Sequence, residues 1–146
     1  MSRTVRFDHI GITVRDLEAA TTFFVGLRLE IEGRTSVSGD FIDTVIGIPG
    51  SSTEIVMLGT SDGETSVELS SFVHPVPGPV PDPAPASALG LRSLALEVDD
   101  LRGEVDRLAD EGYGLVGGIG RFEDEWLMAY VRGPEGIIVA LAERLA

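Results

Sequence analysis

The sequence FDHIGITVRDL at residues 7–17 is matched later in the chain by LRSLALEVDDL at residues 91–101. Both stretches have a valine, an aspartate and a leucine in the same register, and apolar residues alternate with small or polar ones in each. Alternation with a period of two predicts a strand with one buried face. Each stretch then passes through an aspartate, Asp16 or Asp100, into a helical pattern that ends near a glycine. Each half of the chain is therefore predicted to begin with a strand and a capped helix.

The ends of the two halves also repeat. GTSDGETSVEL at 59–69 and VRGPEGIIVAL at 131–141 each place a turn before a final strand. Two further strands are predicted between the helix and the final strand of each half, at 28–34 and 52–58, and at 113–119 and 125–131. Each half is thus expected to be a βαβββ module, which makes the chain an α+β protein with eight strands and two principal helices.

A proline-rich stretch, HPVPGPVPDPAPASALG, joins the two halves. Prolines at alternate positions favour extended polyproline II structure, so this stretch is predicted to be a strut between the modules. We expect a single domain over 1–146, with an N-terminal module at 1–72, a linker at 73–88 and a C-terminal module at 89–146.

The composition excludes several kinds of chemistry. Cysteine and lysine are absent, which excludes disulfides, thiolate zinc sites and Schiff-base lysines. The net charge of −13 disfavours nucleic acid and anionic membrane surfaces as partners. No apolar run is long enough for a membrane span and the first residues lack the apolar stretch of a signal peptide, so we expect a cytoplasmic protein.

The alternation of side chains along a strand is expected to bring two reactive side chains to one face of the sheet. If the apolar residues of the first and last strands of the N-terminal module pack under its helix, His9 and Glu68 both face the other side of the sheet. The corresponding positions of the C-terminal module are Ser93 and Ala140, which are small and uncharged.

Two such modules, with first strands like DHIGITVRDLE and ends like VELSSF and RGPEGIIV, resemble the vicinal oxygen chelate superfamily. That superfamily includes glyoxalase I, methylmalonyl-CoA epimerase, extradiol dioxygenases, fosfomycin-resistance enzymes and bleomycin-resistance proteins. The resemblance implies the glyoxalase/bleomycin-resistance fold, in which paired modules form a cupped mixed sheet around a divalent metal. The ligands implied by the resemblance fall at His9, Glu68, Ser93 and Ala140, so two of the four have lost their ligating groups.

The resemblance therefore implies a weak divalent-metal site, for zinc, manganese, nickel or iron, with His9 and Glu68 as metal ligands and catalytic residues. Glu97, or His74 if the chain turns sharply, are alternatives for a third ligand. A nucleotide cofactor is not expected, because the GYGLVG stretch at 112–117 follows a helix and enters a strand, the reverse of a dinucleotide-binding turn.

Three functions stay open on these residues. The first is a glyoxalase-like lyase or isomerase of the glyoxalase and epimerase branch. The second is metal-free acid-base chemistry, with Glu68 as proton acceptor and His9 as its partner. The third is metal-free binding or sequestration of a small molecule, as in bleomycin-resistance proteins, whose cationic ligands suit an acidic chain.

The partner implied in each case is a small-molecule ligand, and the resemblance also implies a homodimer, because a second chain commonly completes or buttresses the cup. Arg121 and Arg132 are candidates for holding a ligand carboxylate, or else ordinary arginines at turns. Further residues that could line the cavity are Thr13, Glu97, Trp126, Met128 and Tyr130, although parity leaves the last three either in the cup or in the core.

Overall fold

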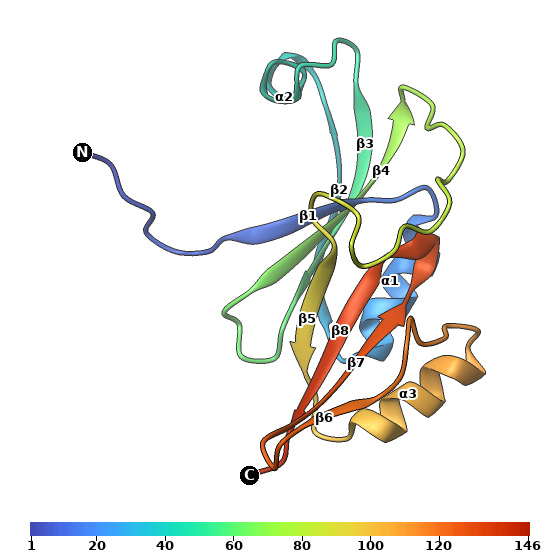
Figure 1. The fold of residues 1–146 in the computed structure, drawn as a ribbon. Helices are drawn as coiled ribbons and strands as arrows, with labels where there is room; N and C mark the ends of the chain where they lie inside the picture. Colours follow the sequence, from blue (N-terminus) through green and yellow to red (C-terminus); the bar gives the residue numbers. More distant parts are fainter. The chain divides into compact units, whose positions relative to one another are not determined.

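The computed structural model describes all 146 residues and divides the chain into two compact units, Met1–Val80 and Pro81–Ala146 (Figure 1). The boundary lies inside the proline-rich stretch. Each unit contains one four-stranded sheet and one helix of ten residues. The predicted α+β class and the two βαβββ modules are confirmed.

The first unit contains the strands whose repeat pattern begins the chain. Its sheet has the order β1-β4-β3-β2, in which β1 runs parallel to β4 and the other neighbours are antiparallel. The elements are β1 (His9–Thr13), α1 (Leu17–Gly26), β2 (Glu30–Ser38), α2 (Asp40–Ile46), β3 (Ser52–Gly59) and β4 (Ser66–His74).

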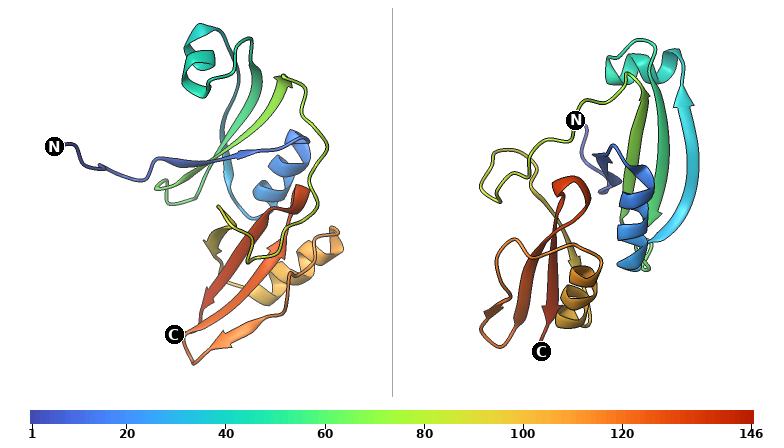
Figure 2. Two further views of the ribbon diagram at one scale, coloured as in Figure 1. Left: turned by 45° about the horizontal axis from the view of Figure 1, so that its top comes forward. Right: turned by 90° about the vertical axis from the view of Figure 1, so that its right-hand side faces the viewer.

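The core of this unit lies between α1 and one face of the sheet, as the views of Figure 2 show. Phe23 and Phe24 of α1 are buried together with the apolar residues that alternate along the central strands, namely Val56, Leu58, Val67 and Leu69. Because side chains alternate across a strand, the residues between these positions lie on the opposite face. We call this opposite face, which carries His9 and Glu68, the site face.

The second unit repeats the arrangement, with the strand order β5-β8-β7-β6 and β5 parallel to β8. Buried residues alternate along β7, whereas four consecutive residues of β8, at 138–141, are buried, and α3 packs on these two strands. The elements are β5 (Ser93–Glu97), α3 (Leu101–Asp110), β6 (Gly120–Phe122), β7 (Trp126–Arg132), a short 3-10 helix (Pro134–Gly136) and β8 (Ile138–Arg144).

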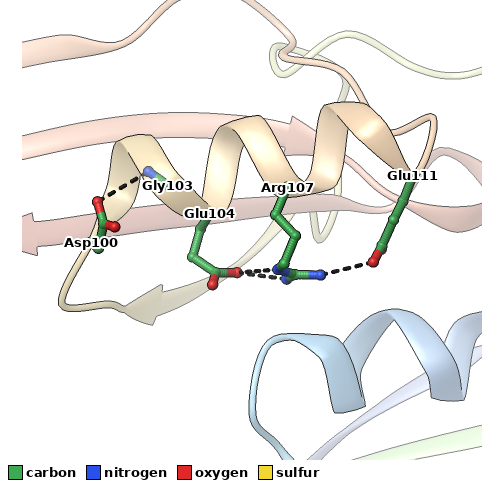
Figure 3. Close-up of polar contacts among 5 residues, drawn as sticks. All are labelled: Asp100, Gly103, Glu104, Arg107 and Glu111. Carbon is green, nitrogen blue, oxygen red and sulfur yellow. Dashed lines mark hydrogen bonds and ion pairs between the residues drawn. The ribbon is translucent and has the colours of Figure 1, made fainter.

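Both main helices begin at the aspartates that the sequence predicts as caps. Asp16 Oδ1 accepts a hydrogen bond from the backbone N–H of Ala19 at 3.0 Å, and Asp100 Oδ1 accepts one from Gly103 at 3.0 Å. Figure 3 shows the second cap. These bonds satisfy backbone donors that have no partner within the helix.

A half-buried side of α3 carries a short charge network (Figure 3). The Arg107 guanidinium contacts Glu104 at 2.6 Å and Glu111 at 3.1 Å. The hydrogen bond to Glu104 raises the pKa of Arg107. Pairs spaced three and four residues apart lie on one side of a helix, and each adds a few tenths of a kcal/mol.

Replacing Asp100 by alanine is expected to lower the free energy of unfolding by about 1 kcal/mol, because the Gly103 N–H loses its acceptor. Urea denaturation followed by circular dichroism measures this change. Asp99→Ala is the matched control, since the neighbouring Asp99 makes no hydrogen bond or ion pair. An equal loss in both variants would contradict the capping role.

Two parts of the fold differ from the sequence prediction. The strand predicted at 113–119 is wrong, because this stretch makes only an isolated bridge from Leu115 to Val131, and the strand that pairs with β7 is β6. Gly117 and Gly118 offer no side chain to pack on a sheet, which weakens strand formation there. The helix α2, between β2 and β3, was not predicted.

No helix of the structure is long and apolar enough to cross a membrane.

Candidate functional site

The parallel pairing of β1 and β4 brings His9 and Glu68 together on the site face. In the register of these strands Gly11 lies opposite Glu68, so the glutamate side chain can reach diagonally toward His9. His9 Nε2 lies 3.4 Å from Glu68 Oε2. The two side chains are 36% and 28% exposed, so the pair is open to a ligand from solvent.

A second carboxylate holds the other side of the His9 ring. Asp8 Oδ2 lies 2.7 Å from His9 Nδ1, and Asp8 Oδ1 lies 2.7 Å from the guanidinium of Arg6. The hydrogen bond from His9, followed by the charge of Arg6, lowers the pKa of the Asp8 carboxyl. The sequence analysis missed Asp8, although an acidic residue directly before a candidate histidine ligand is a readable signal.

These contacts give the two ring nitrogens different partners. An ionised carboxylate can only accept a hydrogen bond, so Nδ1 donates to Asp8. Nε2 then faces the Glu68 carboxylate, where it can act as a second donor or as a ligand of a metal ion that Glu68 would share.

The distance between Nε2 and Oε2 is long for a direct hydrogen bond. Charge-assisted N–H···O bonds are about 2.7–2.9 Å long, shorter than the 3.4 Å observed. Two ligands at zinc distances, separated by a tetrahedral angle, lie about 3.4 Å apart. The hydrogen bond from Nδ1 to Asp8 is also the partner that metal-binding histidines usually have.

No third donor completes the pair, because no group of three or more His, Cys, Asp or Glu side chains that could hold a metal occurs in the chain. His74, proposed as a third ligand, is exposed at the end of β4 opposite Ser52. Glu97, the other alternative, belongs to the second unit, where its Oε1 lies 3.9 Å from Arg144.

Small residues surround the pair on the site face. Across the sheet, His9 lies opposite Ser66, and Ser66 lies opposite Gly59. Two residues further along the strands, Gly11 lies opposite Glu68, and Glu68 lies opposite Met57. Thr13, predicted to line the cavity, is hydrogen-bonded to Ser70 at 3.3 Å on this face. Apart from Met57, the residues opposite His9 and Glu68 on the sheet are therefore small.

In the second unit the residues equivalent to the pair have no ligating chemistry. The pairing of Ala95 with Ala140 repeats the pairing of Gly11 with Glu68, so the equivalence predicted from the repeat holds in the register. Ser93 lies at the position equivalent to His9. Ala140 is only 3% exposed.

The alternating residues Trp126, Met128 and Tyr130 lie on the same face of the second sheet as Ala140. Tyr130 is directly opposite Ala140 in the antiparallel register, and the buried residues of β7 are the ones between these three. The guanidinium of Arg144 lies 4.3 Å from the centre of the Trp126 ring, which is a cation–π contact.

Arg121 and Arg132 both donate hydrogen bonds to other groups of the second unit. Arg132 Nη1 donates to the carbonyls of Ala84 at 2.6 Å and Gly136 at 3.3 Å. Arg121 donates to the Glu123 carbonyl and to the Asp124 carboxylate. These contacts favour the structural role for both arginines over the binding of a ligand carboxylate.

Comparisons with known proteins agree with this architecture. A glyoxalase family protein from Bacillus cereus is 36% identical, with 99% of this chain and 97% of that chain covered and a TM-score of 0.94. TnmS3, an antibiotic binding protein from Streptomyces sp. CB03234, is 19% identical over 99% of both chains, with a TM-score of 0.63. No curated protein matches the chain.

A domain from Frankia sp. EAN1pec, described as glyoxylase/bleomycin resistance protein/dioxygenase, is 17% identical, with 99% of this chain and 98% of that chain covered and a TM-score of 0.63. At this identity the likeness shows the fold alone. The sequence pattern of one family matches residues 8–130, most of the chain. The chain belongs to the Glyoxalase/Bleomycin resistance protein/Dioxygenase superfamily.

Proposed function

We propose that the protein is a glyoxalase-like lyase or isomerase whose first unit binds a divalent metal weakly through His9 and Glu68. The observation that carries this proposal is the distance of 3.4 Å between His9 Nε2 and Glu68 Oε2, which is long for a direct hydrogen bond and matches the spacing of two ligands on one zinc ion. The Asp8 contact supports the same assignment, because it orients the ring with Nε2 toward Glu68.

The residues of the site would divide the chemistry between them. A divalent ion held here would polarise a carbonyl or enolate oxygen of the substrate. Glu68 would accept and return the proton at the carbon beside that oxygen through Oε1, the oxygen that does not face His9. His9 would be the second ligand of the metal ion, and Asp8 would fix the orientation of its ring. Gly11 and Ser66 leave room beside the pair for a small molecule.

Metal-free binding of a small molecule is the second candidate. It is supported by the lack of a third donor and by the small residues at Ser93 and Ala140. The aromatic side chains of Trp126 and Tyr130, on the face that carries Ala140, would suit a flat ligand. The antibiotic binding protein TnmS3 shares the fold, which makes this function compatible with the architecture.

Titration calorimetry with zinc separates the two candidates. The metal-free protein is expected to bind one zinc ion per chain with micromolar or weaker affinity, because two protein donors leave the other coordination positions to water. Bound zinc should also raise the melting temperature by mass action. A wild-type protein that binds no zinc and shows no thermal shift at millimolar zinc would instead support metal-free binding.

A further inference from the structure

A β-bulge in β2 directs one more carboxylate toward the site face. Ile31 pairs with Leu58 and Gly33 pairs with Met57, so Glu32 is an extra residue with no partner in the register. An extra residue of this kind bends the strand and changes the direction of a side chain. Leu58 packs on the α1 side, whereas Met57 and Gly59 lie on the site face.

The Glu32 carboxylate lies over Gly59 and is held there by a serine. A Cβ atom at Gly59 would be 2.7 Å from Glu32 Cδ, a distance that no real side chain could keep. The Ser66 hydroxyl donates a hydrogen bond of 3.0 Å to Glu32 Oε1. The Ser66 hydroxyl therefore holds this exposed carboxylate over Gly59, where no side chain occupies the space.

This position belongs to the same row of the sheet as His9. The row runs from His9 through Ser66 to Gly59, and its two inner residues are small. Neighbouring strands are about 4.8 Å apart, so the backbone of Gly59 lies about 10 Å from that of His9. A small molecule held at the His9–Glu68 pair could therefore reach the Glu32 carboxylate across this row.

The Glu32 carboxylate has no cationic partner in the protein. Its one contact is the neutral hydroxyl of Ser66. Arg34, the basic residue of the same strand, is turned to the α1 side and pairs with Glu18 at 2.8 Å. The chain as a whole has a net charge of −13, which also attracts cations to this face.

We infer that Glu32 is a specificity-determining residue that binds an ammonium group of the small-molecule ligand. The positive charge of such a ligand would supply the counter-ion that the fold does not provide. The inference rests on the proposed function only in placing the other end of the ligand at His9 and Glu68. The substrate class is thus a small carbonyl compound or aromatic molecule that carries an amine.

Methyl NMR of methionine-labelled protein tests this inference directly. Met57 lies opposite Glu68 and beside Gly33, so its methyl signal reports on a ligand bound at this part of the site face. The probes are 2-phenylethylamine, 2-phenylethanol and 3-phenylpropanoate, which share a ring and differ in charge. The amine is expected to shift the Met57 methyl signal and to bind at least about tenfold more tightly than the other two.

Glu32→Gln should remove this preference, because an amide keeps the shape and the Ser66 contact but loses the charge. The matched control is Glu54→Gln, which removes the same charge from another glutamate held by a serine, Ser36, at 2.8 Å on the opposite face. Amine binding in Glu54→Gln should equal that of the wild type.

Three results would overturn the inference: no probe shifts Met57, the alcohol binds as well as the amine, or the two variants behave alike. The zinc titration of the wild type reports the proposed function separately. Amine selectivity without zinc uptake would leave Glu32 in its role and refute the metal site. Zinc uptake without amine selectivity would do the reverse.

Discussion

His9→Ala is expected to abolish the binding of zinc and manganese, with no heat of binding detectable at any concentration that the wild type responds to. The reason is the number of donors. A site of one imidazole and one carboxylate leaves, after the substitution, a single carboxylate that is 28% exposed and competes poorly with water for the ion. Titration calorimetry and the thermal shift on adding metal measure the loss.

The chain offers a matched control, because it contains only two histidines. His74→Ala removes the same group from an exposed position at the end of β4 and should leave metal binding unchanged. Asp8→Asn should weaken binding about 10–100-fold, as expected for the partner that orients a histidine ligand. Metal uptake that survives in His9→Ala, or disappears in His74→Ala, would show that the ion binds elsewhere.

The sequence predicted those parts of the fold that repeat or alternate. The strands that start at residues 9 and 93 follow from the two-residue period, and the helices that start at residues 17 and 101 follow from the capping aspartates; the structure has all four. The same period placed His9 and Glu68 on one face without knowledge of their distance. These predictions succeeded because alternation and capping are local and are enforced by burial of the apolar residues.

Features that depend on one extra residue or on a loop could not be predicted in this way. The bulge at Glu32 shifts the register by one residue, and nothing in the sequence EIEGRT marks which residue is unpaired. Because of the bulge, the alternation of side chains along β2 does not predict which face of the sheet carries Glu32. Likewise, the glycine-containing stretch 113–119 makes only an isolated bridge to β7, and the strand ladder with β7 is formed by the residues that follow it.

Phe24→Ala is expected to lower the free energy of unfolding of the first unit by about 3–5 kcal/mol, the usual cost of deleting a buried phenylalanine ring. Phe24 is 0% exposed, and its ring meets that of Phe23 edge to face with centroids 5.1 Å apart. The deletion leaves a cavity between α1 and the sheet. Since small domains have only about 5–15 kcal/mol in total, the loss should be plain in urea denaturation.

Phe41→Ala is the matched control, because it deletes the same ring from α2, where Phe41 is 80% exposed. Its effect should stay within about 0.5 kcal/mol. Equal losses in the two variants would contradict the position of the core. Because Phe24 packs on the face opposite His9 and Glu68, Phe24→Ala protein that remains folded should still bind zinc, although a smaller fraction of the chains will be folded. A loss of affinity in the folded protein would mean instead that the α1 packing holds β1 and β4 in the register that brings the two ligands together.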